Sequence, residues 1–163
     1  MVIRGRNARV CSLFLAVGFA PGPHHIARMS RHLLPPPEAA AIEQLALASL
    51  DALPQHFREQ VQQVVVKVEE FATAEQLASV GIESRWELTG LYEGRPLHEQ
   101  SQWDTGDLPP MITLFRQPLI REWRETGVDF AALIHHVTIH EAGHHFGLSD
   151  EDMHALEDAA GDE

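Results

Sequence analysis

The apolar and polar positions of this chain follow a helical period in two long segments. Residues 38–53 are strong helix formers whose apolar positions recur every three or four residues, which predicts an amphipathic helix that ends at Pro54. A second helix is predicted after Asp129, which can cap its first turn, and it ends at Gly147. The body of this second helix is unusually apolar, so we expect it to be buried.

Three shorter segments show features of strands. They are rich in β-branched and aromatic residues and lie at residues 64–71, 86–92 and 111–115. Further short helices are predicted at residues 55–62, 73–80, 119–126 and 150–159. Because strands and helices do not alternate regularly, the predicted class is α+β, with a mixed sheet of about three to four strands packed on helices.

Length and composition limit the organisation of the chain. Its 163 residues suffice for one domain, and the hydrophobic fraction of 44% is ordinary for a globular protein. The single cysteine, Cys11, permits neither a disulfide framework nor a cysteine-based zinc site. Any metal must therefore be held by nitrogen and oxygen ligands.

The first 34 residues are predicted to lie outside the domain, which is assigned to residues 35–163. Residues 10–20 form an apolar run that has the length of a signal-peptide core but is too short to span a bilayer. Pro21 follows the small residue at which cleavage would occur, and Met29 offers a second start. We expect a leader that contributes nothing to the fold and a cytoplasmic protein. Export is the alternative if residues 1–20 act as a signal peptide.

The charge balance is strongly acidic. Acidic residues outnumber basic ones by 24 to 12, which gives a formal net charge of -12. Four of the basic residues precede Met29, so the rest of the chain is more acidic still. Solubility is the simplest explanation for this surplus. A surface of this charge repels phosphate backbones, so nucleic-acid binding is disfavoured unless a metal supplies positive charge. No membrane partner is expected.

The second long helix carries the sequence H-E-A-G-H. Two histidines four residues apart lie about 40° apart around a helix and one turn apart along it, so His140 and His144 can reach one metal ion. Glu141 lies about 100° around the helix from His140, close enough to a water on that metal to take its proton as a general base. This spacing is typical of zincins, in which two ligands and the base share one helix.

The pattern continues as H-E-x-x-H-x-x-G-x-x-D, with Gly147 and Asp150 in place. By chance, a chain of this composition contains the five-residue pattern with a probability of about 7%, and the longer one with about 2 in 10,000. Glycine permits the left-handed turn that takes the chain off the helix, and Asp150 then arrives as an oxygen ligand. Three protein ligands leave the fourth position of zinc for water, which is the catalytic arrangement. We therefore predict one Zn²⁺ held by His140, His144 and Asp150.

The neighbouring residues have plainer interpretations. His136 is one turn too far along the helix and is predicted to be a core or supporting residue, while His135 and His145 point elsewhere. His154 is predicted to lie at the surface or to support the site from the last helix. Met153 follows the third ligand too closely to act as the methionine that underlies the metal in metzincins, so we interpret it as core packing.

The chain resembles the short bacterial zincin-like metallopeptidases that carry this extended pattern. The likeness covers roughly residues 38–158, including GLYEGRPL (90–97) and LPPMITLFRQPL (108–119), and TIHEAGHHFGLSDEDM is its most specific part. The resemblance implies a small zincin-like fold, one metal ion and hydrolysis of peptide bonds in an extended substrate. It also implies that the substrate adds to a sheet edge, and residues 111–115 are predicted to provide that edge.

Carried over by position, His140, His144 and Asp150 match the family's metal ligands and Glu141 its catalytic base. Two other functions stay open at this point. Zinc could serve folding alone in a binding or regulatory module, with His154 closing the fourth position. A metal-dependent ribonuclease uses a similar ligand spacing, but the acidic surface and the aspartate ligand disfavour it.

Overall fold

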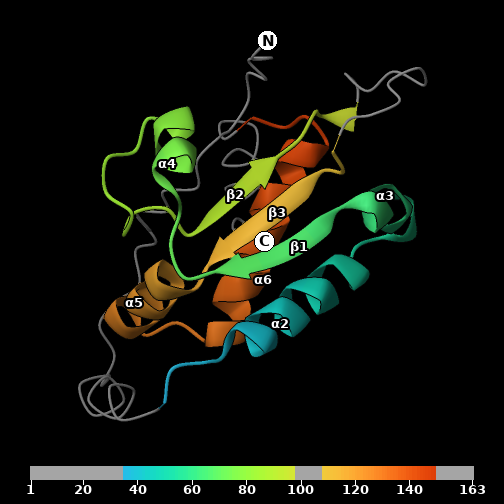
Figure 1. Ribbon diagram of the computed structural model, residues 1–163. Helices are drawn as coiled ribbons and strands as arrows, with labels where there is room; N and C mark the ends of the chain where they lie inside the picture. The colour runs from blue at the N-terminus through green and yellow to red at the C-terminus, as the bar shows by residue number, and fades with distance from the viewer. Residues whose placement is uncertain (1–34, 98–107, 150–163) are drawn as a thin grey trace.

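The protein is a mixed sheet with helices packed on it, shown as a computed structural model in Figure 1, and the structure describes residues 35–97 and 108–149. In chain order its elements are α2 (Ala39–Asp51), α3 (Gln55–Gln60), the 3-10 turn η1 (Val61–Gln63), β1 (Val65–Glu69), α4 (Ala74–Val80), β2 (Gly90–Glu93), β3 (Met111–Phe115), α5 (Arg116–Thr126) and α6 (Phe130–His145). The predicted α+β class is therefore confirmed.

Within the described residues, three strands form the sheet in the order β1-β3-β2. β1 runs parallel to β3, with Val66 opposite Ile112, and β2 runs antiparallel to it, with Tyr92 opposite Ile112. The prediction that residues 111–115 form the substrate-binding edge is wrong, because β3 is the central strand. Its last four residues are all buried, so both faces of this strand are covered, as central strands require.

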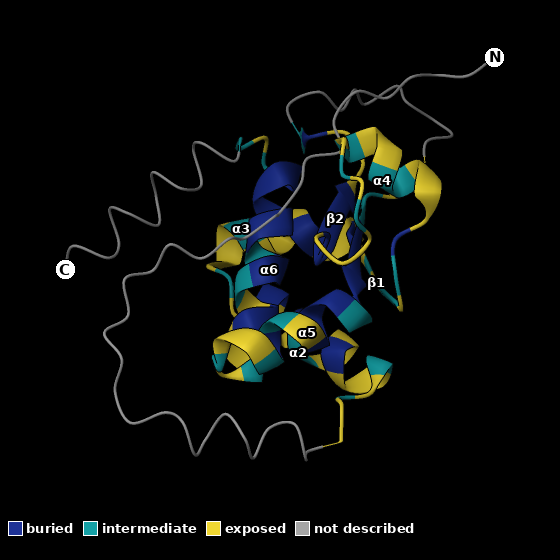
Figure 2. Cartoon of the chain, turned by 90° about the vertical axis from the view of Figure 1, so that its left-hand side faces the viewer, coloured by how far each residue is buried: buried dark blue, intermediate teal, exposed yellow. Residues whose placement is uncertain are grey.

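Two helices cover one face of the sheet and form the main core with it (Figures 1 and 2). α2 packs on β1, α6 packs on β2 and β3, and the two helices pack against each other. This core is apolar, and its fully buried members are Ile42, Ala46, Tyr92, Ile112, Leu114, Leu119, Ile134, Val137 and Ala142. A smaller cluster on the other side joins Leu91 and Phe115 to side chains of α4. Leu91 and Tyr92 thus serve opposite faces, as the two-residue period of a strand dictates.

Two element boundaries differ from those predicted. Residues 86–89 precede β2 rather than belong to it, and Glu87 N donates to Ser84 O in a turn. α5 begins at Arg116 instead of residue 119. Pro118 does not prevent this earlier start, because it falls in the first helical turn, where no backbone donor is needed. Arg116 anchors this start by donating to both carboxylate oxygens of Glu70 at 3.1 Å.

Within residues 35–97 and 108–149, no helix has both the length and the apolar character needed to cross a membrane. The predicted leader, residues 1–34, and the predicted last helix, residues 150–159, lie outside the described residues.

The side chain of Glu122 on α5 is partly buried, and one of its carboxyl oxygens is covered at an energetic cost. Glu122 Oε1 has no hydrogen-bond partner within the described part of the chain. Burial raises the pKa of this carboxyl to about 7, and repulsion from the Glu125 carboxylate adds to the rise. The folded state therefore favours the neutral form of Glu122.

We expect Glu122→Gln to stabilise the protein at alkaline pH and to change little at acid pH. An unfolded glutamate ionises near pH 4.5 while the folded one stays neutral until about pH 7, so the wild type loses stability as pH rises through this window. Because the side chain is partly exposed, the gain at about pH 8 is on the order of 1 kcal/mol in the free energy of urea unfolding. Glu43→Gln, an exposed position on α2, is the control, and equal gains in both variants would contradict the expectation.

Candidate metal centre and active site

The helix that carries the H-E-A-G-H sequence is buried along its second half (Figure 2). α6 begins as predicted, with Asp129 Oδ1 accepting from Ala132 N at 2.9 Å. The exposed fraction is 4% at His140, 0% at Glu141 and 4% at His144. Burying three titratable side chains in one turn of helix is costly, and such groups gather at functional sites.

α6 brings the two predicted metal-binding histidines together. The ring centroids of His140 and His144 lie 5.2 Å apart, and the rings are nearly perpendicular at 83°. The ring of His136, one turn earlier, lies 6.3 Å from that of His140. The four-residue spacing therefore gives the side-by-side arrangement that was predicted for His140 and His144.

The protonation of His144 is set by a backbone carbonyl. Its Nδ1 lies 3.1 Å from Leu148 O. A carbonyl oxygen can only accept, so in the neutral ring Nδ1 carries the proton and Nε2 keeps its lone pair. A backbone carbonyl that fixes a histidine in this way is a common support for a metal ligand.

The chain leaves α6 through the left-handed turn predicted at Gly147, whose φ is 85°. Leu148 N donates to Gly143 O and Gly147 N donates to His144 O, both at 3.0 Å. These two bonds form a Schellman motif, which terminates the helix at its last carbonyls. The turn also delivers Leu148 O to the ring of His144.

The donor set suits a metal as far as the structure describes it. Two imidazoles on one helix face are nitrogen ligands of the kind zinc prefers. Residues 35–97 and 108–149 contain no group of three potential ligands that could hold a metal. The predicted third ligand, Asp150, lies outside the described residues and directly follows Ser149, and His154 and Met153 lie beyond it.

Glu141 lies beneath the start of the edge strand β2. A Cβ atom added at Gly90 would be 2.9 Å from Glu141 Oε1 and 2.7 Å from Val137 Cγ1. The absence of a side chain at position 90 therefore lets the strand approach α6 closely enough to contact the carboxylate. An isolated glycine in a predicted strand is a known sign of close backbone approach, but it does not say which group approaches.

A second contact between β2 and α6 lies one turn further along the helix. Tyr92 Oη is 2.9 Å from His145 Nδ1, and both residues are only 1% exposed. His145 Nε2 is 3.2 Å from Gln60 O, and Tyr92 Oη is 3.1 Å from Arg95 O. His145 thus links α6 to the edge strand β2 and to the end of α3.

The protons in this chain of contacts can be assigned. Burial lowers the pKa of His145, so its ring is neutral and carries one proton, which Nε2 donates to Gln60 O. Nδ1 then faces the Tyr92 hydroxyl as an acceptor, and the one hydroxyl proton is shared between His145 Nδ1 at 2.9 Å and Arg95 O at 3.1 Å. Burial raises the pKa of Tyr92 to about 12, so the hydroxyl keeps its proton.

No pattern in the sequence indicates that Tyr92 and His145 form a pair. They are 53 positions apart, and only the fold brings them together. His145 was predicted to have no ligand role, and its ring is directed to Tyr92 and Gln60. His135 is exposed and His136 is half-buried, and both border a cavity beside His140.

The comparison with known protein families agrees with the arrangement of His140, Glu141 and His144. The model of the zincin-like metallopeptidase family matches residues 61–160, more than half of the chain. The chain therefore belongs to the zincin-like metallopeptidases, which confirms the resemblance seen in its sequence. A search of curated proteins finds no match.

We expect Tyr92→Phe to lower the free energy of unfolding by about 1–3 kcal/mol, because it leaves the buried Nδ1 of His145 without its donor. Urea denaturation measures the change. Ser79→Ala, which removes an exposed hydroxyl bond to Gln76 O, is the control and should stay within about 0.5 kcal/mol of wild type. Equal stability of wild type and Tyr92→Phe would show that the Tyr92–His145 contact contributes nothing to folding.

Proposed function

We propose that the protein is a zinc-dependent metallopeptidase in which Glu141 is the general base and His140, His144 and Asp150 hold the metal. Membership of the family supports this proposal. The observation that carries it is the fully buried Glu141, which shares one turn of α6 with the neighbouring rings of His140 and His144 and lies beneath an edge strand. A buried carboxylate in this position is costly for folding and useful for moving a proton.

A bound zinc ion would supply Lewis-acid chemistry to the attacking water and the scissile carbonyl. The residues of the chain would transfer the protons and orient the metal ligands. Glu141 takes the proton of the attacking water and delivers it to the leaving amine. Leu148 O favours the tautomer of His144 in which Nε2 keeps the lone pair that a metal would need.

The edge strand β2 is suited to hold the substrate. Phe115 N donates to Thr89 O at 2.9 Å, so Thr89, Leu91 and Glu93 direct their backbone groups to β3. The backbone groups of Gly90 and Tyr92 then point to the outer edge, where no strand of the described residues pairs with them. An extended peptide added to this edge would run above Glu141.

We expect Glu141→Gln to retain zinc and to lose cleavage by a factor of about 10³ or more. This is the usual size of the contributions that general acid-base catalysis and electrostatic stabilisation make to the rate of an enzyme. Glutamine keeps the shape of the side chain but cannot take a proton. His144→Ala should lose both zinc and cleavage. A peptide-library assay read by mass spectrometry, with zinc content measured on the same samples, checks both variants.

The outcome separates the proposal from its alternatives. Equal cleavage by all three proteins would end the peptidase proposal. A wild type that binds zinc tightly, cleaves no peptide and unfolds on chelation would instead be a metal-stabilised binding module. Cleavage of RNA that depends on His144 would identify a ribonuclease.

We expect Gly90→Ala to lower kcat by about 10–100-fold with zinc affinity unchanged, because a misplacement of about 1 Å near the reacting groups has effects of this size. The added methyl group would displace either the strand or the Glu141 carboxylate. Glu93→Ala, on the opposite face of the same strand, is the control, since its carboxylate contacts Gln76 of α4. Equal kcat in wild type and Gly90→Ala would contradict the role given to this contact.

A further inference from the structure

The contact between Tyr92 and His145 holds the edge strand β2 at a defined place along α6. Gly90 and Tyr92 are two residues apart on the strand, so they face the same side and span about 7 Å. Glu141 and His145 are four residues apart on the helix, so they also share one side and span about 6 Å along its axis. Because the two spacings match, Gly90 lies over Glu141 where Tyr92 lies over His145.

Backbone pairing alone does not fix the distance between β2 and α6. The bonds between β2 and β3 set the register within the sheet, and they leave the separation of sheet and helix to the side chains. Apolar contacts, such as that of Gly90 with Val137, are not directional. A hydrogen bond restricts both distance and angle, so the 2.9 Å contact between Tyr92 Oη and His145 Nδ1 is a directional link from strand to helix.

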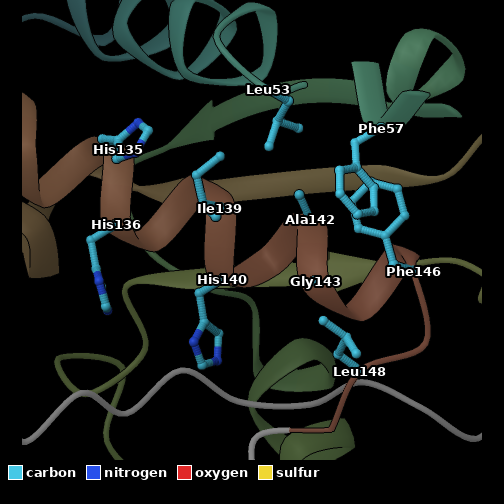
Figure 3. Close-up of a pocket in the computed structure, with 10 residues that line it drawn as sticks. All are labelled: Leu53, Phe57, His135, His136, Ile139, His140, Ala142, Gly143, Phe146 and Leu148. Carbon is cyan, nitrogen blue, oxygen red and sulfur yellow. The ribbon is translucent and has the colours of Figure 1, made fainter. Parts of the chain in front are cut away.

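The helix end of this link is held by α3. His145 Nε2 lies 3.2 Å from Gln60 O, a carbonyl in the last residue of α3, where the helix itself leaves carbonyls open. The next residue of the chain, Phe146, packs its ring against that of Phe57 with the centroids 4.9 Å apart (Figure 3). α3 is therefore docked on the end of α6, and the ring of His145 is fixed from the side opposite Tyr92.

The strand end of the link is held by the turn after β2. A Cβ atom added at Gly94 would lie 2.6 Å from Tyr92 Oη, so the hydroxyl group lies directly against the backbone there. The same oxygen is 3.1 Å from Arg95 O. The lack of a side chain at position 94 therefore gives the hydroxyl group the room in which it meets His145.

We propose that Tyr92 and His145 are positioning residues for peptide cleavage, because their contact sets how closely β2 lies over Glu141. The inference rests on the proposed peptidase function. A peptide held on the outer edge of β2 moves with the strand, whereas Glu141 belongs to α6. A shift of the strand therefore changes the distance between the scissile bond and the base, and this lowers kcat more than it weakens binding.

The first test separates positioning from folding by kinetics. Tyr92→Phe removes the hydroxyl group and keeps the ring, and it should lower the kcat of the zinc enzyme by about 10–100-fold with KM changed by less than about threefold. Its zinc content should equal that of wild type. Activities are measured under conditions in which urea melts show each protein to be folded. Equal kcat in Tyr92→Phe and wild type would overturn the inference.

Val68→Ala is the control for lost stability. Val68 packs on the main core from β1, which β3 separates from β2, so the substitution weakens the core and leaves β2 in place. It should keep the kcat of wild type. Equal losses of kcat in Val68→Ala and Tyr92→Phe would assign both to reduced stability, and the positioning role would then be wrong.

Double variants test whether Tyr92 acts through the approach of β2 to Glu141. Gly90→Ala disturbs the same approach, so its combination with Tyr92→Phe should lose much less kcat than the product of the two single losses. The combination of Tyr92→Phe with His145→Leu should behave in the same way, because each substitution removes one partner of the same contact. Losses that multiply in both pairs would show independent effects and contradict the proposal.

A distance measurement separates this inference from the proposed function. Gly90 lies against α6, since a Cβ atom there would be 2.7 Å from Val137 Cγ1. Full-length protein with labelled valine methyl groups should show a nuclear Overhauser effect between the α-protons of Gly90 and Val137. Tyr92→Phe should lose most of its intensity, and Val68→Ala should retain it. An unchanged effect in Tyr92→Phe would overturn the inference whether or not peptides are cleaved, and a lost effect supports the placement of β2 even in a protein that cleaves none.

Discussion

The structure depends on the burial of polar, titratable side chains along an otherwise apolar helix. α6 forms half of the helical layer beneath the sheet, yet its second half carries His140, Glu141, His144 and His145, each at most 4% exposed. These groups cannot be left in the core without partners or a function, because desolvation of each is costly. The surrounding elements are shaped accordingly: the strand above has no side chain at Gly90, and the end of α3 offers a carbonyl to His145.

Local patterns predicted most of the elements and the centre of the site. The helical period and the Asp129 cap located α6, and the four-residue spacing predicted the adjacency of His140 and His144. Each of these is a property of one helix and needs no knowledge of its neighbours. The left-handed conformation of Gly147 was predictable for the same reason, since a chain must leave its helix through a residue that tolerates positive φ.

What the sequence did not predict depends on contacts between distant segments. The alternating pattern of residues 111–115 fits a strand in any position, and only pairing on both sides makes β3 central. The contact between Tyr92 and His145 joins segments 53 positions apart, and no local rule distinguishes it from two unrelated core residues. The predicted third ligand, Asp150, stays a prediction, because it lies beyond the described residues.

The bond from His144 to Leu148 O shows that the turn at Gly147 does more than end α6. The carbonyl that chooses which ring nitrogen is protonated belongs to a residue placed by the left-handed turn itself. The backbone conformation at position 147 is thereby coupled to the chemistry of a side chain three residues earlier. Through this coupling, Gly147, a residue with no functional group of its own, helps to set the tautomer and the orientation of a candidate ligand.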